Sequence, residues 1–215
     1  VSPGGPNGKN TEKFVGDLIT SSTTIYAYAD VGTSATKICY DEKPLVITIK
    51  SKPEPKILVS SICVDVDKGV TTDGYASSNY NSSHYTFDWK NASGVTVSTA
   101  SDFSTQIAGN YTLTVNDVSV GGCISEAVPF TILISSKPAK VTFSTSGWFS
   151  DNQTITVNAI PYPGYEKNFL YVLDNDKPQT SPVFTNVSSG THTIAVSDAY
   201  GCGSTPIAIP IKLIS

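Results

Sequence analysis

The sequence predicts an all-β chain built from tandem antiparallel β-sandwich modules. Threonine and serine occur throughout and Val, Ile, Tyr and Phe are frequent, a composition typical of β-strands. Apolar and polar residues alternate with period two in several segments, and long stretches with helical period are missing. A long motif also occurs twice, which indicates that the 215 residues form repeated modules rather than one large domain.

The repeated motif is AGNYTLTVNDVSVGGC at residues 108–123 and SGTHTIAVSDAYGC at residues 189–202. Each copy contains a glycine suited to positive φ, an alternating strand, an aspartate suited to an Asx-turn and a Gly-Cys pair. A second alternating run follows each Gly-Cys pair and predicts the last strand of the module. These runs are Val128, Phe130, Ile132 and Ile134 in the first copy, and Ile207, Ile209, Ile211 and Leu213 in the second.

An upstream pair of strands repeats as well, YTFDW at residues 85–89 and FLYVL at residues 169–173. Trp89 lies on the alternating pattern of its strand, so we expect it in a hydrophobic core. The phrase Ser-Lys-Pro occurs at residues 51–53 and again at residues 136–138. A proline after the last strand ends sheet pairing and stiffens a short linker, so these phrases indicate module boundaries.

A third copy at the amino end contains only the tail of the motif. It has a strand at residues 25–28, Cys39 and a last strand at residues 45–49. About 50 residues cannot supply the seven or so strands of a sandwich, so this unit is either truncated or paired with strands from elsewhere, including a neighbouring chain. The predicted division is residues 1–52 as the C-terminal part of a truncated module, followed by complete modules at residues 53–137 and 138–215.

Charge and hydropathy exclude several classes of protein. The formal net charge is −4, and all basic residues are lysines, so the arginine fork that binds phosphate and guanine is missing. No apolar run reaches the roughly 18 residues that span a bilayer, and the amino end lacks the apolar stretch of a signal peptide. The chain also contains no methionine. We expect no nucleic-acid partner, no membrane span in these residues, and a fragment of a longer, processed polypeptide.

The segments GNYTLTVNDVSVGGC and GTHTIAVSDAYGC resemble the phrase G-x-Y-T-V-x-V-x-D-x-x-G-C of a known family. This family comprises the immunoglobulin-like (Ig-like) and PKD-like repeats of very large surface adhesins, including gliding-motility adhesins, of Bacteroidota-type bacteria. The opening TTIYAYADVGTSATKICYDEKPLVITI is similar to the tail of the same repeats. The resemblance implies tandem Ig-like sandwiches in a secreted or cell-surface adhesin, acting as a stalk or as adhesive display. Its implied partners are neighbouring modules of the same chain, and a surface polysaccharide or another surface protein.

The cysteine positions predict one disulfide. Cys63 and Cys123 lie sixty residues apart in one predicted sandwich, and an exported context would allow them to bond; two buried free thiols are the alternative. In the chain-entropy model such a loop contributes about 4 kcal/mol. Cys202 is expected to lack a partner, because Gly147 lies where Cys63 would align in the last module, and Cys39 is expected to lack one because its module is truncated upstream. A zinc site is not expected, since the cysteines are far apart with no C-x-x-C and no nearby histidine.

Exposed aromatic rings would give a second function. Tyr75 and Tyr80 lie in a predicted Gly/Ser/Asn-rich loop, and Trp148 in a second loop; flat rings of this kind stack on sugars. These three residues are the candidate ligand platform, and core or loop packing is the alternative for each. The alternative function is therefore a carbohydrate-binding accessory module of a secreted polysaccharide-degrading enzyme.

Catalytic and metal chemistry have weaker signals. The pairs Asp65/Asp67 and Asp174/Asp176 are read either as calcium ligands or as ordinary Asx-turns. His84 and His192 adjoin or lie in predicted strands with no local nucleophile or orienting acid, which favours half-exposed strand residues. We therefore expect a non-enzymatic chain with no catalytic residue and no cofactor.

Overall fold

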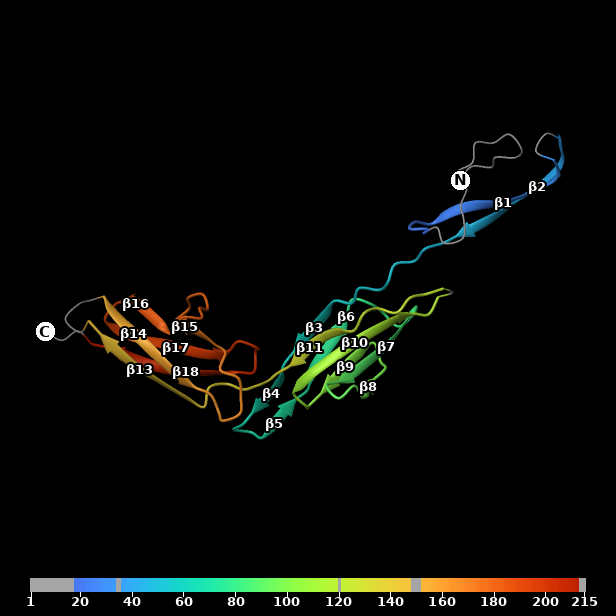
Figure 1. The fold of residues 1–215 in the computed structure, drawn as a ribbon. Coiled ribbons are helices and arrows are strands. Elements are labelled where there is room, and N and C mark those ends of the chain that lie inside the picture. Colours follow the sequence, from blue (N-terminus) through green and yellow to red (C-terminus); the bar gives the residue numbers. More distant parts are fainter. Residues whose placement is uncertain (1–17, 34–35, 120, 148–151, 213–215) are drawn as a thin grey trace. The chain divides into compact units, whose positions relative to one another are not determined.

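In the computed structural model, the described residues are 18–33, 36–119, 121–147 and 152–212, and they form β-strands and turns with no helix (Figure 1). The predicted all-β fold class is confirmed. None of the described segments is therefore a helix of the length and apolarity needed to cross a membrane. The chain divides into two compact units, Val1–Lys52 with Val120–Cys123 and Pro53–Ser119 with Ile124–Ser215.

The first unit contains an antiparallel hairpin of β1 (Thr23–Thr33) and β2 (Thr36–Ile47). The register runs from Thr23 opposite Ile47, with a bulge between Val31 and Gly32. Cys39 lies inside β2 opposite Val31, whereas the sequence predicts a later start for this strand. At the open end the Ser22 hydroxyl oxygen accepts the Ile49 N–H at 2.9 Å, which closes the hairpin beyond its last ladder pair.

The second unit contains two β-sandwiches, and the first of them, the middle module, has two main sheets. One sheet has the strand order β3-β6-β9, and the other has the order β11-β10-β7-β8. The bounds are β3 (Ile57–Ser60), β6 (Gly74–Ser78), β9 (Asp102–Thr105), β7 (Tyr85–Asn91), β8 (Thr96–Ser98), β10 (Gly109–Asp117) and β11 (Val128–Ile132).

The core of the middle module lies between these sheets and is rich in aromatic rings. Trp89 is fully buried, as predicted, and its indole N–H donates to the Ala100 carbonyl at 2.8 Å. The Trp89 ring stacks on Phe103 and meets the edge of Phe130, with ring centroids 5.8 and 5.5 Å away. The buried residues are Ile62, Ala76, Phe87, Trp89, Phe103, Tyr111, Leu113, Val115 and Ile132.

A third, small sheet extends the middle module. It contains β4 (Ile62–Asp65) between β5 (Val70–Thr72) and β12 (Ile134–Ser135). The chain leaves β3 at Ser61, and β4 then pairs in parallel with β12, so that Cys63 lies opposite Ser135. Gly74 permits this crossing, because a Cβ there would lie 2.6 Å from a methyl group of Ile132. The β4–β5 hairpin is thus held against the end of the last strand.

The last module has the same two-sheet plan with fewer strands. One sheet has the order β13-β14-β16 and the other β15-β17-β18. The bounds are β13 (Lys140–Ser146), β14 (Gln153–Ile160), β15 (Phe169–Leu173), β16 (Val183–Val187), β17 (Gly190–Asp198) and β18 (Ser204–Ile211). Its core contains Ile155, Val157, Ala159, Phe169, Tyr171, Phe184, Val187, Ile194, Val196, Ile209 and Ile211.

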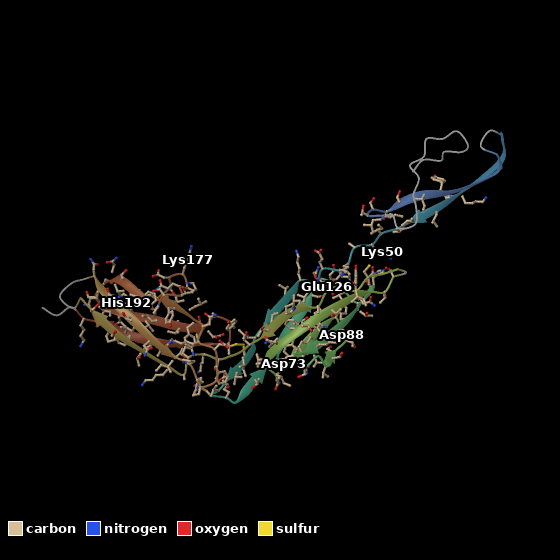
Figure 2. All side chains as sticks on the ribbon, in the orientation of Figure 1. Lys50, Asp73, Asp88, Glu126, Lys177 and His192 are labelled. Atoms are coloured by element: carbon tan, nitrogen blue, oxygen red, sulfur yellow. A yellow bond between two sulfur atoms is a disulfide. The ribbon has the colours of Figure 1, made fainter. Side chains whose placement is uncertain are left out.

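The repeat in the sequence is a repeat of strand pairing. In the middle module β10 pairs with β7 on one side and β11 on the other. In the last module β17 pairs with β15 and β18 in the same antiparallel way. The predicted fold class of tandem Ig-like antiparallel β-sandwiches is confirmed. Of the charged side chains labelled in Figure 2, Asp88 lies on β7, whereas the exposed Lys50, Asp73, Glu126 and Lys177 lie in segments between strands.

Candidate functional site

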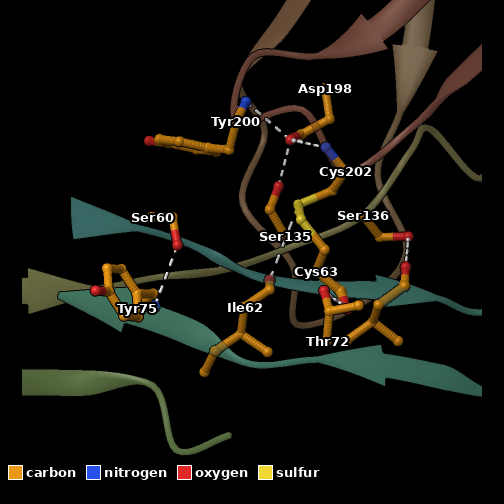
Figure 3. Close-up of a disulfide and its surroundings, with 11 residues drawn as sticks. Ser60, Ile62, Cys63, Thr72, Tyr75, Ser135, Ser136, Asp198, Tyr200 and Cys202 are labelled. Atoms are coloured by element: carbon orange, nitrogen blue, oxygen red, sulfur yellow. Dashed lines mark hydrogen bonds between the residues drawn. A yellow bond between two sulfur atoms is a disulfide. The ribbon is translucent and has the colours of Figure 1, made fainter. Parts of the chain in front are cut away.

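The two sandwiches of the second unit are joined by a disulfide between Cys63 and Cys202, whose Cα atoms lie 4.9 Å apart (Figure 3). The prediction of a Cys63–Cys123 bond is therefore wrong, and so is the prediction that Cys202 lacks a partner. Cys123 is a free, partly buried thiol. The prediction that the chain contains a disulfide is confirmed, but the bond connects two modules rather than closing one.

The path of β4 explains the pairing. Cys63 lies opposite Ser135, beyond the carboxyl end of β11. Ile124, the residue after Cys123, instead forms a bridge with Asn116 near the carboxyl end of β10, the strand antiparallel to β11. The segment that leads to Cys123 thus starts from the opposite end of this hairpin. A disulfide needs Cα atoms within about 7 Å, a distance that Cys63 meets with Cys202 in the next module.

Cys202 lies in a tight turn between β17 and β18 that Asp198 organises. One oxygen of the Asp198 carboxylate accepts the backbone N–H groups of Tyr200 at 2.9 Å and Cys202 at 3.1 Å. The other oxygen accepts the hydroxyl of Ser135, the last residue of β12 (Figure 3). Gly201 supplies the positive φ of 84° that the turn requires. The predicted Asx-turn is confirmed, and its carboxylate also bonds across the junction.

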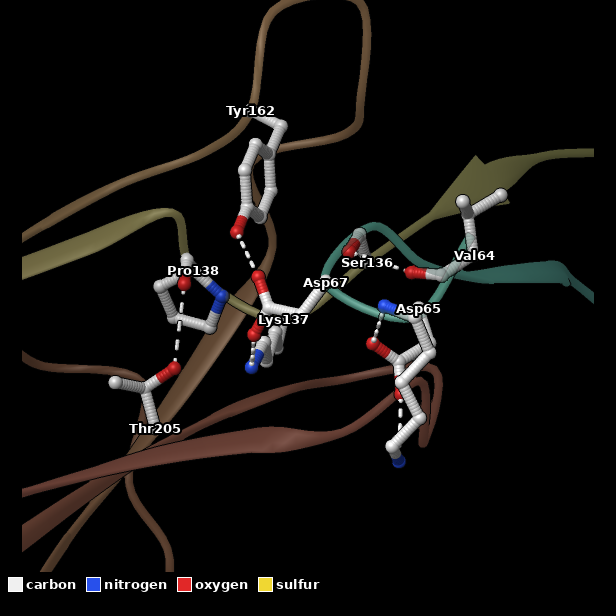
Figure 4. Close-up of polar contacts among 9 residues, drawn as sticks. Val64, Asp65, Asp67, Ser136, Lys137, Pro138, Tyr162 and Thr205 are labelled. Carbon is white, nitrogen blue, oxygen red and sulfur yellow. Dashed lines mark hydrogen bonds and ion pairs between the residues drawn. The ribbon is translucent and has the colours of Figure 1, made fainter. Parts of the chain in front are cut away.

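The linker between the modules is held on both sides. The Ser136 hydroxyl donates to the Val64 carbonyl at 2.6 Å, and Thr205 donates to the Pro138 carbonyl at 3.2 Å (Figure 4). Ser135, Ser136 and Pro138 are all nearly inaccessible to solvent. A linker that is buried and hydrogen-bonded loses the freedom of an exposed one, so the Ser-Lys-Pro phrase here is part of the packed structure.

Asp67, in the turn between β4 and β5, makes polar contacts at the junction, the region where the middle module, the linker and the last module meet. It forms an ion pair with Lys137 of the linker and accepts the phenol of Tyr162, from the last module, at 2.8 Å (Figure 4). The hydrogen bond from Lys137 and then that from Tyr162 lower the pKa of the Asp67 carboxyl. The same carboxylate raises the pKa of Lys137 and of Tyr162. Asp67 is exposed, and Lys137 and Tyr162 are only partly buried, so this ion pair and hydrogen bond orient the groups more than they stabilise the fold.

Three of the four residues in the predicted acidic pairs, Asp65, Asp67 and Asp174, bond to protein donors through their side chains. Asp65 accepts the Lys68 N–H at 3.2 Å and pairs with its ammonium group at 2.9 Å, as an Asx-type turn would. Asp174 accepts the Thr193 N–H at 2.8 Å and contacts His192. The described residues contain no group of three or more His, Cys, Asp or Glu side chains placed to hold a metal ion. The local geometry of Asp65 favours the Asx-turn interpretation.

A shallow depression borders the disulfide. Its volume is about 470 Å³, and it is lined by Cys63, Asp65, Lys68, Val70, Thr72, Gly201, Cys202 and Gly203. The Lys68 side chain there is mostly exposed. The disulfide is consequently within reach of solvent and of small reductants on this side.

Of the three residues proposed as a ligand platform, Tyr75 is exposed and Tyr80 is packed against the core. Tyr75 lies on β6 with 43% of its surface exposed. Desolvation and a hydrogen bond to Asp102 raise the pKa of its phenol. Tyr80 instead packs beside the middle core, 4.5 Å from the Tyr85 ring, and its hydroxyl accepts the Glu54 N–H at 2.9 Å. Trp148 lies outside the described residues. Tyr80 is thus a packing residue, and the structure gives Tyr75 no described partner ring.

His192 occupies the position of Tyr111 in the repeat and makes two hydrogen bonds. Its Nδ1 lies 2.8 Å from Asp174 and its Nε2 lies 3.1 Å from the Ser188 carbonyl. Both neighbours are acceptors, an arrangement that favours the imidazolium form, in which both ring nitrogens carry protons. The hydrogen bond to Asp174 is the main cause of a raised His192 pKa. The predicted half-exposed strand position is confirmed for His192.

No family model matches the chain, and no curated protein matches it. Among solved structures, the chain is similar to one titled "Structure of amphioxus IgVJ-C2 molecule", with 14% sequence identity and a TM-score of 0.30. The similarity covers 66% of this chain and 96% of that one. The Ig-like fold class follows from the sheet topology and not from this likeness.

The Ser-Lys-Pro phrase predicts a module boundary at residues 136–138, but no pattern in the sequence predicts that Ser135, Tyr162 and Asp198 make contacts across it. One signal for the disulfide was available in the repeat. A Gly-Cys turn recurs in both complete modules, whereas a cysteine equivalent to Cys63 is missing from the last one. A repeated cysteine without a mate inside its own module indicates a bond between modules.

Proposed function

We propose that this chain is a non-enzymatic spacer segment of a secreted or cell-surface bacterial adhesin, in which consecutive Ig-like modules are stapled into a stiff unit. The Cys63–Cys202 disulfide between two sandwiches carries this proposal. Each sandwich has its own hydrophobic core, so neither needs the bond to complete its interior. A bond placed between two cores fixes how one module follows the next, and a spacer requires this property.

The disulfide would also divert a pulling force. Tension along the chain enters the middle module at its amino end and would pass through the bond at Cys63 directly to Cys202. The 139-residue separation between these cysteines is then excluded from extension. At about 3.5 Å per residue this corresponds to roughly 480 Å of chain that stays folded under load. Shielding on this scale suits a surface stalk that is pulled by its ligand.

An extracellular location agrees with the disulfide, because such bonds persist in oxidising compartments. The resemblance of the Gly-Cys repeats to those of gliding-motility adhesins supports the finer assignment to a bacterial surface protein. A surface polysaccharide or a second surface protein is the partner proposed for the parent adhesin. The carbohydrate-binding alternative stays a prediction, and the packed position of Tyr80 does not favour it.

Single-molecule pulling on the oxidised chain and on the C63S/C202S variant tests the mechanical part. We expect the variant to release about 480 Å more chain than the oxidised protein. An equal total extension would contradict the proposed role in load bearing. For the location, an antibody against the chain should label intact cells of the source bacterium. Recovery of Cys63 and Cys202 as thiols from the cytosol would overturn the extracellular assignment.

A further inference from the structure

The outer face of the β3-β6-β9 sheet has Tyr75 at its centre. Residues alternate along these strands, so Ala76 and Phe103 are buried in the middle core whereas Tyr75 faces outward. The register places a serine on each side of Tyr75, at Ser60 on β3 and Ser104 on β9. We call this surface the Tyr75 face; its other members, on these strands or directly beside their ends, are Leu58, Asp73, Ser77, Asp102 and Gln106.

Hydrogen bonds along the sheet hold the Tyr75 ring. Its phenol donates to Asp102 and also bonds to Ser77. Ser77 lies two residues further along β6, about 7 Å away, and Asp102 lies opposite Ser77 on the neighbouring strand. A phenol that reaches both groups requires a ring that leans along the sheet and does not stand upright from it. One face of the ring is therefore turned to solvent, in agreement with the 43% exposed fraction of Tyr75.

The neighbours of the ring are held by hydrogen bonds as well. The Ser60 hydroxyl oxygen accepts the Tyr75 N–H at 3.1 Å (Figure 3). At the opposite end of the face from Asp102, the Gln106 side-chain amide donates to the Asp73 carboxylate at 2.8 Å, which links the ends of β6 and β9. Side chains that are already fixed lose little conformational entropy when a ligand binds. The Tyr75 face is therefore preorganised.

The chemistry of the Tyr75 face fits a sugar. A flat aromatic ring packs on the C–H groups of a pyranose, while carboxylate and amide groups hydrogen-bond to its hydroxyls. The face holds Asp73 and Asp102 and no lysine, so its charge disfavours an acidic glycan. Leu58, with 76% of its surface exposed, adds an apolar edge. Its strands lie about 4.8 Å apart and its rows of side chains about 7 Å apart, so the face is wider than one sugar ring.

We propose that the Tyr75 face binds a neutral hexopyranose unit of a polysaccharide. The sugar ring stacks on Tyr75, and its hydroxyls bond to Asp102 on one side and to Gln106 on the other. The site uses one aromatic ring with polar neighbours and does not depend on Tyr80. The inference rests on the proposed function in that a surface polysaccharide is one of the partners proposed there. Its test measures sugar binding, whereas the pulling experiment measures chain extension, so either can fail alone.

Affinity electrophoresis of the oxidised 215-residue chain tests the site, in native gels that contain a β-glucan, a mannan, a galactan or, as the acidic probe, alginate. We expect at least one of the neutral polysaccharides to retard the chain, and alginate to have no effect. Tyr75→Ala should weaken binding about tenfold because the stacking surface is lost, whereas Tyr75→Phe keeps the ring and should bind within about threefold of the unchanged chain. Asp102→Ala should weaken binding about fivefold through loss of a hydrogen bond.

Tyr200→Ala is the matched control, since Tyr200 lies on the last module with 39% of its surface exposed and its loss should leave binding unchanged. Urea denaturation checks the folding of each variant, and Asp102→Ala decides the test if Tyr75→Ala does not fold. Retardation by none of the neutral polysaccharides would overturn the proposal, as would stronger retardation by alginate or binding that Tyr75→Ala leaves intact. A dimer of the chain that Tyr75→Ala abolishes would also overturn it, because a second copy would then occupy the face.

Discussion

The two sandwiches of the second unit differ at their first strand. In the last module β13 pairs directly with β14 from Lys140 opposite Ile160 to Ser146 opposite Thr154. In the middle module the matching strand β3 pairs with β6 over only four residues, and the chain then continues as the β4–β5 hairpin. Both modules keep the Asp and Gly-Cys turn, which forms the disulfide through Cys202 in the last module and carries the free thiol of Cys123 in the middle one. The middle module alone of the two adds a hairpin that donates a cysteine.

Because of this difference, the two sandwiches contribute unequally to the disulfide. The middle module contributes Cys63 to the bond and keeps Cys123 as a free thiol, whereas the last module contributes Cys202 and contains no further cysteine. A donor hairpin that reaches the following module fixes the order of the two sandwiches without any change to either core. The disulfide between the modules therefore depends on the added β4–β5 hairpin and not on the strands that both sandwiches share.

The largest expected effect comes from removing the staple with the double substitution C63S/C202S. In the chain-entropy model a loop of 139 residues contributes about 5 kcal/mol. We expect two separate unfolding transitions where the oxidised chain shows coupled ones, measured by calorimetry. Cys123→Ser is the control and should change stability by less than about 0.5 kcal/mol. Coincident transitions in the double variant would mean that the polar contacts alone couple the modules.

The next prediction compares the two cores at equivalent strand positions. Trp89→Ala removes a fully buried side chain and should cost about 3–5 kcal/mol in the middle module. Leu173→Ala, at the aligned position on β15, removes a partly buried side chain and should cost about 1–2 kcal/mol. Urea unfolding in the C63S/C202S background assigns each loss to its module. Equal losses would show that the last module is packed as tightly around Leu173 as the middle one is around Trp89.

The Asx-turn residues of the two modules, Asp198 and Asp117, are expected to differ in how much they contribute to the free energy of unfolding. Asp198 is 97% buried, accepts two backbone N–H groups and bonds to Ser135, so Asp198→Ala should cost about 3 kcal/mol. Asp117 is only partly buried, and Asp117→Ala should cost about 1 kcal/mol. Chemical denaturation of the oxidised chain measures both. If Asp117→Ala proved the more costly change, the Ser135 bond across the junction would have no stabilising role.

The smallest effect is a pH dependence confined to the last module. The Asp174 hydrogen bond raises the His192 pKa above its ordinary value of about 6.5, so this stabilisation is complete below that pH and is lost as pH rises through the folded pKa. The Thr193 N–H and then His192 lower the Asp174 pKa, so its contribution is lost only as pH falls through that lowered value. We expect a loss of about 1 kcal/mol on raising the pH from 6 to 8.

His192→Tyr gives the last module the residue that the middle module has at Tyr111, and it is the matched variant for this pH test. Its denaturation midpoint should be flat from pH 6 to 8, since no imidazolium is left to titrate. A slope that persists in the variant would assign the pH dependence to another group. Tyr111 itself donates its hydroxyl to the Ile107 carbonyl at 2.7 Å, a bond without a titration in this range.

Local patterns in the sequence determined the strands, the repeat and the two cores. Alternation with period two depends only on neighbouring residues, and it correctly predicted Trp89 in the core and the last strands β11 and β18. Of the residues assigned to these strands, Ile134 instead lies on the separate strand β12, and Leu213 lies outside the described residues. The Asp residues that end β10 and β17 were correctly predicted to form Asx-turns for the same reason, because the acceptor and its donors lie within a few residues.

The cysteine pairing and the burial of the linker were decided by tertiary structure. A disulfide depends on which Cα atoms come close in space, and the sixty-residue spacing of Cys63 and Cys123 gives no information about that. The crossing of β4 to β12, permitted by the close approach at Gly74, carries Cys63 to the end of its module and to Cys202. That path depends on residues far apart in the chain, so no local pattern could fix it.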